Sequence, residues 1–323
     1  MKIAILDDYQ DVVRNLDCFK LLKEHDVKVF NNRAVGLGQL AIRLASFDAL
    51  VLIRERTRLN RNLLCKLPNL KVIAQTGRLA GNIDLDAAHE QGIAVLEGTG
   101  DPTAPAELTW ALIMASSRKI PQYHQFLKEG IWQTASLHPQ YNQLGRVLRG
   151  RRLGIWGYGK VGQLLATYAK AFGMQVFIWG SPSSRARALD DGNSVYETKQ
   201  QLFNESDIVS VHLRLTDQTR ACITLSDLLS MQINSLFVNT SRAELVAPGA
   251  LELALDQGRP GFAAIDVFES EPLIVPHPLI GRENVLATPH IGFVEKDSYE
   301  RYFGAAFQSL LDFQQNHPNE KEC

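Results

Sequence analysis

The feature that most constrains the fold is an alternation of short, nearly apolar runs with helix-like segments along the whole chain. A run that is apolar on both faces is typical of a strand buried in a parallel sheet. The alternation forms two series, which indicates two doubly wound α/β domains. The strand-like runs of the first series are residues 2–6, 27–30, 49–53, 71–76 and 93–97, and those of the second are 151–157, 174–179, 207–213, 235–241, 262–268 and 285–291.

Between the two series the strand signals stop at a Gly/Pro-rich stretch, residues 98–107. Residues 134–145 are polar and irregular, so we expect a loop or a lid there. The last segment is amphipathic with no strand after it. The expected helices are residues 11–23, 84–91, 107–117, a segment that starts near Pro121, and 295–313.

Composition excludes several classes of protein. A length of 323 residues fits two domains, and 45% hydrophobic residues can form substantial cores. A net charge of −1 gives no general attraction to nucleic acid or to an acidic membrane. The N-terminus lacks the apolar core of a signal peptide, and no apolar stretch is long enough to span a membrane. The four cysteines, Cys18, Cys65, Cys222 and Cys323, are scattered as in a reduced compartment, so we expect a soluble, cytoplasmic protein.

The sequence contains no motif of a metal site or of a catalytic nucleophile. There is no HExxH and no paired Cys/His spacing, so we expect no metal site. No GxSxG elbow is present. The basic stretch at residues 146–152 is short and precedes a strand, which favours a solvated face over a nucleic-acid contact.

A glycine-rich turn follows the first strand of the second series. Gly157, Gly159 and Gly162 form a GxGxxG pattern between a strand and a helix, the context that gives this pattern its meaning. The first glycine permits a tight turn, the second lets the backbone approach a pyrophosphate, and the third lets the helix pack on the strand. The alternative is a glycine-rich turn without a ligand. We expect a dinucleotide, with its phosphates at the start of the helix.

The acid that usually holds the ribose hydroxyls of NAD is missing from the end of the next strand, where Gly180 stands. Ser181, Ser183 and Ser184 add hydroxyl donors, and Arg185 supplies a positive charge. The alternative is a polar loop that opens the next helix, with Ser183 or Ser184 as its N-cap. We therefore expect NAD(P)(H), with NADP(H) mildly favoured.

Three polar groups follow later strands, at the edge where a doubly wound domain binds its ligands. Arg242 can hold a carboxylate with two parallel hydrogen bonds. His290 can pass a proton to an alkoxide, and Glu271 can orient the ring and favour its charged form. Taken singly, the histidine could be structural, Arg242 could pair with a nearby acid, and Glu271 could be an exposed loop acid. Together with a dinucleotide turn they indicate hydride transfer to a carbonyl.

The motifs GYGKVG, VHLRLTDQTR, VNTSRAELV, AAIDVFESEP and TPHIG occur here in the order found in the D-isomer-specific 2-hydroxyacid dehydrogenases. The chain resembles this family, which includes D-3-phosphoglycerate dehydrogenase and glyoxylate/hydroxypyruvate reductase, over nearly its whole length. The resemblance implies that Arg242, Glu271 and His290 are the catalytic triad. It also implies a Rossmann-type cofactor domain, residues 101–293, inserted into a flavodoxin-like substrate-binding domain, residues 1–100 plus 294–323. Members usually form homodimers through the cofactor domain, which would use the helix over residues 107–117.

The resemblance extends to individual binding residues. It implies that the backbone of the loop at residues 78–81 holds the substrate carboxylate, and a glycine-flanked turn can form such an anion-binding nest. An ordinary strand-to-helix connection is the alternative. Arg54 matches an arginine near the substrate, although it also fits a surface charge run. The implied substrate-binding residues are Arg54, Arg78, Leu79, Ala80, Gly81, Arg242 and His290. The implied cofactor-binding residues are Gly157, Tyr158, Gly159, Lys160, Val161, Gly162, Gly180, Ser181, Ser183, Ser184, Arg185, His212, Thr219, Thr240, Asp266 and His290.

The function that these features predict is hydride transfer between NAD(P)H and a small 2-keto acid, giving the D-2-hydroxy acid. Two alternatives remain open. One is a related formate- or phosphite-oxidising dehydrogenase, although the formate branch carries an amide at the position of Glu271. The other is a dinucleotide-sensing regulatory protein like the co-repressors that share this fold, because folds alone do not carry function.

Overall fold

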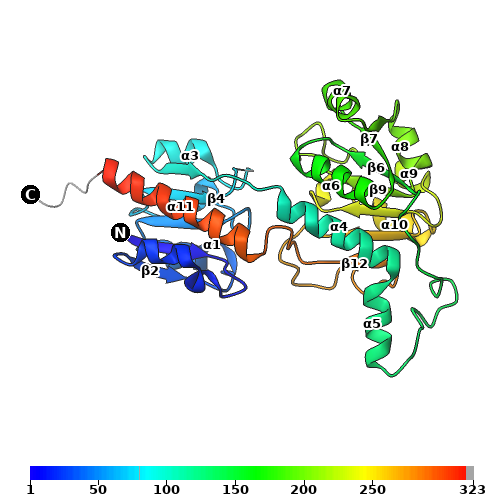
Figure 1. The fold of residues 1–323 in the computed structure, drawn as a ribbon. Coiled ribbons are helices and arrows are strands. Elements are labelled where there is room, and N and C mark those ends of the chain that lie inside the picture. Colours follow the sequence, from blue (N-terminus) through cyan, green and yellow to red (C-terminus); the bar gives the residue numbers. More distant parts are fainter. Residues whose placement is uncertain (80, 318–323) are drawn as a thin grey trace, which may run out of the picture. The chain divides into compact units, whose positions relative to one another are not determined.

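The computed structural model describes residues 1–79 and 81–317. It divides into two compact units. The first unit joins Met1–Asp101 to the segment that begins at Val294, and the second is Pro102–Phe293. The chain therefore passes between the units twice, at Asp101/Pro102 and at Phe293/Val294. Each unit has a parallel sheet of its own (Figure 1).

The first unit contains a five-stranded parallel sheet in the order β2-β1-β3-β4-β5. This is the flavodoxin-like order, as expected. One face is covered by α1, α2 and α3, and the other by α11 and a short 3₁₀ helix, η2. The elements are β1 (Lys2–Leu6), η1 (Val13–Asn15), η2 (Asp17–Leu22), β2 (Asp26–Val29), α1 (Gly36–Leu44), β3 (Ala49–Ile53), α2 (Arg61–Leu64), β4 (Val72–Thr76), α3 (Leu85–Glu90), β5 (Ala94–Glu97) and α11 (Lys296–Asn316).

The helix expected over residues 11–23 is replaced by η1 and η2. Two features interrupt it. Leu16 is extended between the two 3₁₀ helices, and the carboxylate of Glu300 accepts hydrogen bonds from the backbone N–H groups of Asp17 and Cys18, at 2.6 and 3.0 Å. Glu300 lies on α11, far along the chain. A tertiary contact therefore overrides the local helical pattern.

The second unit contains a seven-stranded parallel sheet in the order β12-β11-β10-β9-β6-β7-β8. Its strand order reverses between β6 and β9, as in the Rossmann fold, so the doubly wound prediction is confirmed here too. The elements are α4 (Thr103–Arg118), α5 (Ile120–Lys128), β6 (Arg152–Trp156), α6 (Lys160–Ala171), β7 (Gln175–Trp179), α7 (Pro182–Asp190), β8 (Ser194–Val195), α8 (Lys199–Glu205), β9 (Ile208–Val211), α9 (Leu225–Leu229), β10 (Leu236–Asn239), η3 (Ala243–Leu245), α10 (Ala250–Asp256), β11 (Phe262–Ile265) and β12 (Val285–Ala287).

Two apolar cores lie on opposite faces of this sheet. Helices α4, α6 and α7 contribute Leu112, Leu165 and Ala188 to one core. Helices α8, α9 and α10 contribute side chains such as Phe203 and Leu251 to the other. The strands are apolar on both faces because both faces are covered, which is the reason that the sequence pattern predicted them. Only the two-residue strand β8 is too short for such a pattern.

The helices of the described residues include none that is both long and apolar enough to cross a membrane. Likewise, no cluster of three or more His, Cys, Asp or Glu side chains suited to a metal ion occurs within residues 1–79 and 81–317.

Candidate active site

The glycine turn lies at the point where the strand order of the second sheet reverses, between β6 and β9. Gly157 has φ +103°, and a Cβ there would lie 2.5 Å from the carbonyl oxygen of His212, which follows β9. A Cβ on Gly162 would overlap the carbonyl oxygen of Gly157. Both positions therefore require glycine, one for its backbone angle and its neighbour, the other for close packing of α6 on the turn.

Gly159 differs from the other two glycines. It is the N-cap of α6, and a Cβ built on it would meet no atom within 4 Å. Open space therefore adjoins the first backbone N–H groups of α6, where the helix dipole favours an anion. These residues fit the pyrophosphate of a dinucleotide.

Tyr158 is buried and His212 is half-buried, and the side chain of each contacts a neighbouring residue of the second unit. The hydroxyl of Tyr158 donates to Asp191 Oδ2 at 2.9 Å, and burial, aided by this carboxylate, raises the pKa of Tyr158 to about 12. His212 Nε2 lies 2.8 Å from Ser210 Oγ. Burial lowers the pKa of His212 to about 4, so its ring is neutral at pH 7. Tyr158 lies within the glycine turn, and the backbone carbonyl of His212 lies next to Gly157.

The end of β7 has no acid, as expected, and Gly180 can accept a side chain. A Cβ there would lie 3.4 Å from Ser184 Cβ, an ordinary contact distance. The N-cap of α7 is Ser181, whose Oγ accepts the N–H of Ser184 at 3.3 Å. The alternative interpretation, with Ser183 or Ser184 as the N-cap, placed the start of the helix too late, because Pro182 already lies inside it.

The guanidinium of Arg185 contacts two side chains of the second unit. Its Nη1 lies 3.3 Å from Glu197 Oε2, and its guanidinium stacks 5.0 Å from the centre of the Trp179 ring. Glu197 is 76% exposed, so this ion pair contributes little and can be broken at low cost.

Arg242, Glu271 and His290 follow the neighbouring strands β10, β11 and β12 at their carboxyl ends. Nδ1 of His290 lies 2.5 Å from Glu271 Oε2. Because a carboxylate only accepts hydrogen bonds, Nδ1 carries the proton, which leaves Nε2 for another partner. The other oxygen of Glu271 accepts the backbone N–H of Phe268 at 2.8 Å, so the carboxylate is held on both sides.

The backbone of His290 has φ +52°, an uncommon conformation for a residue with a side chain. Such strain persists only where the surroundings enforce it, and it concentrates at functional sites. The ring of Phe293 packs edge-on against the imidazole, with centroids 5.7 Å apart. The imidazole is therefore fixed by its own backbone, by Glu271 and by Phe293.

Asp266 holds the segment that carries His290. It is 1% exposed. One of its oxygens accepts hydrogen bonds from Thr288 Oγ1 at 2.6 Å and from the N–H of Ile291 at 2.9 Å, and the other accepts the N–H of Gly292 at 2.9 Å. Burial raises the pKa of Asp266, although these hydrogen bonds oppose the rise. A contact between Asp266 and the cofactor was expected from the sequence, whereas the carboxylate has three hydrogen-bond partners within the chain.

Arg242 is the N-cap of η3, and its Nη1 donates to the carbonyl of Ser241 at 2.6 Å. The residue that shapes this turn is Asn239, which was not among the residues predicted from the sequence. The side chain of Asn239 accepts the N–H of Ser241 at 3.0 Å and donates to the carbonyl of Arg242 at 2.9 Å. Asparagine commonly bonds to the backbone two residues on, so its place at the end of the strand was the available signal.

Two threonines of the expected cofactor set bond to other parts of the second unit. Thr240 Oγ1 lies 2.7 Å from Thr109 Oγ1 on α4. Thr219 Oγ1 donates to the carbonyl of Arg214 at 2.7 Å. Lys160 and Val161 are the first residues of α6, next to the glycine turn.

The expected substrate loop belongs to the first unit and follows β4. Gly77 and Gly81 both have φ +81°, the turn conformation that a nest requires. The N–H of Leu79, expected to hold a substrate carboxylate, donates to Glu97 Oε1 at 2.9 Å, so in this structure it is already occupied. Ala80 lies outside the described residues. Arg54 has φ +52°, and its side chain packs over Gly77, next to this loop.

Comparisons with known proteins agree on one family. The family model for the NAD binding domain of D-isomer specific 2-hydroxyacid dehydrogenases matches residues 110–292. A glyoxylate reductase of Aeropyrum pernix is 37% identical over 299 residues, which cover 91% of this chain and 88% of that protein. A crystal structure of an oxidoreductase from Ralstonia solanacearum is 58% identical, with a TM-score of 0.95, and covers 98% of this chain and 95% of its own. A phosphoglycerate oxidoreductase from Vibrio cholerae o395 is 50% identical, with a TM-score of 0.94 and coverage of 98% and 99%.

Proposed function

The chain belongs to the D-isomer specific 2-hydroxyacid dehydrogenases, and from this premise we propose that Arg242, Glu271 and His290 catalyse reduction of a small 2-keto acid to the D-2-hydroxy acid. The observation that carries the proposal is the 2.5 Å contact between His290 and Glu271 at the carboxyl edge of the second sheet. An imidazole and a carboxylate in contact at this edge, with an arginine after the neighbouring strand, fit the roles of a reacting site.

The glycine turn and the start of α6 hold the dinucleotide, whose nicotinamide, when bound, supplies the hydride. Nε2 of His290 donates a proton to the carbonyl oxygen of the keto acid as the alkoxide develops. The carboxylate of Glu271 holds Nδ1–H and stabilises the charged ring before that transfer. Arg242 binds the carboxylate of the substrate and polarises the adjacent carbonyl. In the reverse direction, His290 accepts the proton of the hydroxyl group.

The direct test is turnover of a panel of keto acids, followed by the nicotinamide absorbance. The panel contains glyoxylate, hydroxypyruvate, pyruvate, phenylpyruvate and 2-ketoisocaproate. The relatives named glyoxylate reductase and phosphoglycerate oxidoreductase favour the small, polar members of it. In Arg242→Lys, kcat/KM should fall heavily, because lysine keeps the charge but loses the planar pair of donors. Tight dinucleotide binding without turnover of any keto acid would favour a regulatory protein instead.

For the cofactor, the proposal is that NADPH is accepted in preference to NADH. With Gly180 at the end of β7, no carboxylate repels a 2′-phosphate. Three hydroxyls gather at the start of α7, with Ser181 Oγ 3.0 Å from Ser183 Oγ and 3.1 Å from Ser184 Oγ. Arg185 is the cation closest in sequence to them. A 2′-phosphate would then compete with the exposed Glu197 for its guanidinium.

The cofactor proposal is tested by kcat/KM with each cofactor at one fixed keto-acid concentration. Gly180→Asp should turn the preference toward NADH, since a Cβ at this position makes only an ordinary contact with Ser184 and the carboxylate would repel a 2′-phosphate. Arg185→Ala should weaken NADPH use selectively, whereas Arg149→Ala, at an exposed arginine of the same unit, is the control and should leave the cofactor preference unchanged. A wild-type preference for NADH of more than about tenfold, or about 1.4 kcal/mol, would overturn the proposal.

The remaining proposals concern assembly, the two units and location. We infer a homodimer formed through the second unit. The support is a group of exposed apolar side chains on residues 119–147, a segment called the arm below. Figure 1 shows α5 and the following loop extending away from the seven-stranded sheet. The exposed apolar residues of the arm are Ile120, Leu127, Trp132, Leu137, Leu144 and Val147.

The first unit would bind the substrate, through Arg54 and the loop at residues 78–81. A cytoplasmic location is supported by cysteines that are free at positions 18, 65 and 222.

A further inference from the structure

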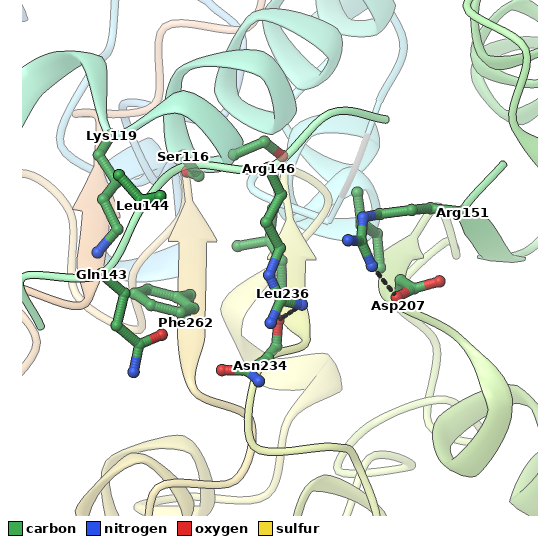
Figure 2. A pocket seen from close by; sticks show the side chains of 12 residues that line it. Ser116, Lys119, Gln143, Leu144, Arg146, Arg151, Asp207, Asn234, Leu236 and Phe262 are labelled. Atoms are coloured by element: carbon green, nitrogen blue, oxygen red, sulfur yellow. Dashed lines mark hydrogen bonds and ion pairs between the residues drawn. The ribbon is translucent and has the colours of Figure 1, made fainter. Parts of the chain in front are cut away.

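A cavity lies at the amino ends of the strands of the second sheet, the edge opposite to the one that carries His290. Its lining includes Arg151 and Asp207, which directly precede β6 and β9, and Phe262, which begins β11. The end of α4 and the returning part of the arm close it from other sides (Figure 2). This cavity, the amino-edge pocket, takes no part in the proposed reaction.

The most unusual residue of the pocket is Lys119. It is only 7% exposed and has φ +53°. Its ammonium group donates to the carbonyl of Tyr141 at 2.5 Å and lies 4.9 Å from the centre of the Phe262 ring. An ammonium has three donors, so one carbonyl leaves it incompletely satisfied. Burial accordingly lowers the pKa of Lys119, and the charge of Glu283 offsets only part of that effect.

Arg146 is the second cation of the pocket. Its Nη1 donates to the carbonyl of Asn234 at 3.2 Å, and Figure 2 shows its side chain reaching through the middle of the hollow. Burial and the neighbouring charge of Arg151 lower the pKa of Arg146. Within residues 1–79 and 81–317, neither Lys119 nor Arg146 forms an ion pair with a carboxylate.

The only acid in the lining does not balance these two charges. Asp207 lies 2.7 Å from Arg151 Nη1 and accepts the backbone N–H of Arg152 at 2.9 Å. The dashed line in Figure 2 marks this contact with Arg151. The charge of Asp207 raises the pKa of Arg146 only in part, against the larger lowering by burial and by Arg151. Two partly buried positive charges remain without a carboxylate in contact, which is costly for a folded protein unless an anion joins them.

Polar neutral groups complete the surroundings. Ser116 Oγ is buried and has no hydrogen-bond partner among the described residues, although it lines the pocket. The amides of Gln143 and Asn234 also face the hollow (Figure 2). On one side, Leu236 and Phe262 form an apolar wall. The lining thus offers donors for an oxyanion and a surface for a short hydrocarbon body.

We propose that the amino-edge pocket binds a small oxyanion, a carboxylate or a phosphate group, between Lys119 and Arg146. The ligand is distinct from the keto acid and from the dinucleotide, because it is held at the opposite edge of the sheet. The competing role for these cations is to offset the negative dipole at the end of α4, where Lys119 is the C-cap. That role requires no ligand, so a binding experiment separates the two.

The experiment titrates the full-length protein with sodium phosphate and, separately, with sodium benzoate at constant ionic strength, using calorimetry and the thermal midpoint of unfolding. At least one anion should bind and raise the midpoint. Binding by phosphate alone identifies a phosphate group as the ligand, and binding by benzoate alone identifies a carboxylate on an apolar body. Lys119→Met and Arg146→Gln should each weaken that affinity at least tenfold, whereas Lys128→Met, the same change at an exposed lysine of α5, should leave it unchanged.

Two further measurements distinguish anion binding in the amino-edge pocket from binding and catalysis at the proposed active site. Keto-acid reduction without added anion should be unchanged in Lys119→Met, and the anion response should survive in Arg242→Lys. Lys119→Met should also raise the thermal midpoint of the anion-free protein, because a buried charge is removed. The proposal is overturned if neither anion binds, or if binding is the same in both pocket variants as in the wild type.

Discussion

At the scale of single residues, the contact between Nδ1 of His290 and Glu271 decides which ring nitrogen can react. Glu271 is itself held by the N–H of Phe268, and Asp266 anchors the backbone on the far side of the histidine. The imidazole therefore needs little reorganisation when a substrate arrives, which is the property that makes a proton donor efficient.

Replacement of His290 by alanine tests the proton transfer. In His290→Ala, kcat for keto-acid reduction should fall by roughly 10²–10⁴, because the proposed donor of the proton to the alkoxide is removed. His89→Ala, a change at an exposed histidine of α3, serves as the control. A kcat within a few-fold of the wild type in a folded variant would show that the proton comes from elsewhere.

Replacement of Glu271 by glutamine tests the role of the neighbouring charge. An amide stabilises the imidazolium less than a carboxylate does. We therefore expect kcat for keto-acid reduction to be lower in Glu271→Gln than in the wild type. Glu269→Gln removes a nearby acid that contacts His277 instead and should leave kcat unchanged. A wild-type kcat in Glu271→Gln would show that Glu271 is only a loop residue.

At the scale of elements, the junction of β6 and α6 contains two glycines with different surroundings. A Cβ on Gly162 collides with the backbone of Gly157, whereas a Cβ on Gly159 meets open space. The same substitution at the two positions should therefore have different consequences, one for folding and one for binding.

Gly162→Ala should lower the free energy of unfolding by about 1–3 kcal/mol, because neither backbone can move freely out of the overlap. Gly159→Ala should leave the unfolding free energy near that of the wild type and weaken dinucleotide affinity, since the methyl group enters the space left for the pyrophosphate. Urea unfolding and a dinucleotide titration followed by tryptophan fluorescence measure the two effects. Wild-type affinity in Gly159→Ala would place the phosphates away from this turn.

At the scale of the whole molecule, the arm carries several exposed apolar side chains. Trp132 is 74% exposed and Leu144 is 87% exposed. Groups of exposed apolar side chains on one segment usually mark an interface. The sequence pointed to the helix at residues 107–117 for that role, whereas the exposed side chains favour α5 and the segment after it.

Disruption of the arm tests the homodimer. Leu127→Glu combined with Trp132→Glu should convert a dimer to monomers in sedimentation at micromolar protein, because two charges would have to be buried in the interface. Ile42→Glu, at an exposed isoleucine of α1, is the control and should leave the dimer intact. Sedimentation of the wild type as a monomer would remove the arm as a site of self-association.

Local pattern alone determined much of this protein. Apolar runs on both faces determined the parallel strands, and three glycines between a strand and a helix determined the tight turn between β6 and α6. Arg242, Glu271 and His290 could be selected because each follows a strand, at the edge where doubly wound sheets bind ligands. These features depend on neighbours in sequence, so the sequence displays them directly.

Only the tertiary structure decided which groups meet. The order β12-β11-β10 brings Glu271 to His290, and the fold gives Asp266 internal partners where a cofactor contact was expected. A contact from Glu300 on α11 replaced a helix at residues 11–23 with two 3₁₀ helices. The amino-edge pocket joins residues from α4 to β11 that no local pattern connects. Periodicity records which face of an element is buried, whereas the partner on that face is set by non-local packing and by the pairing of buried polar groups.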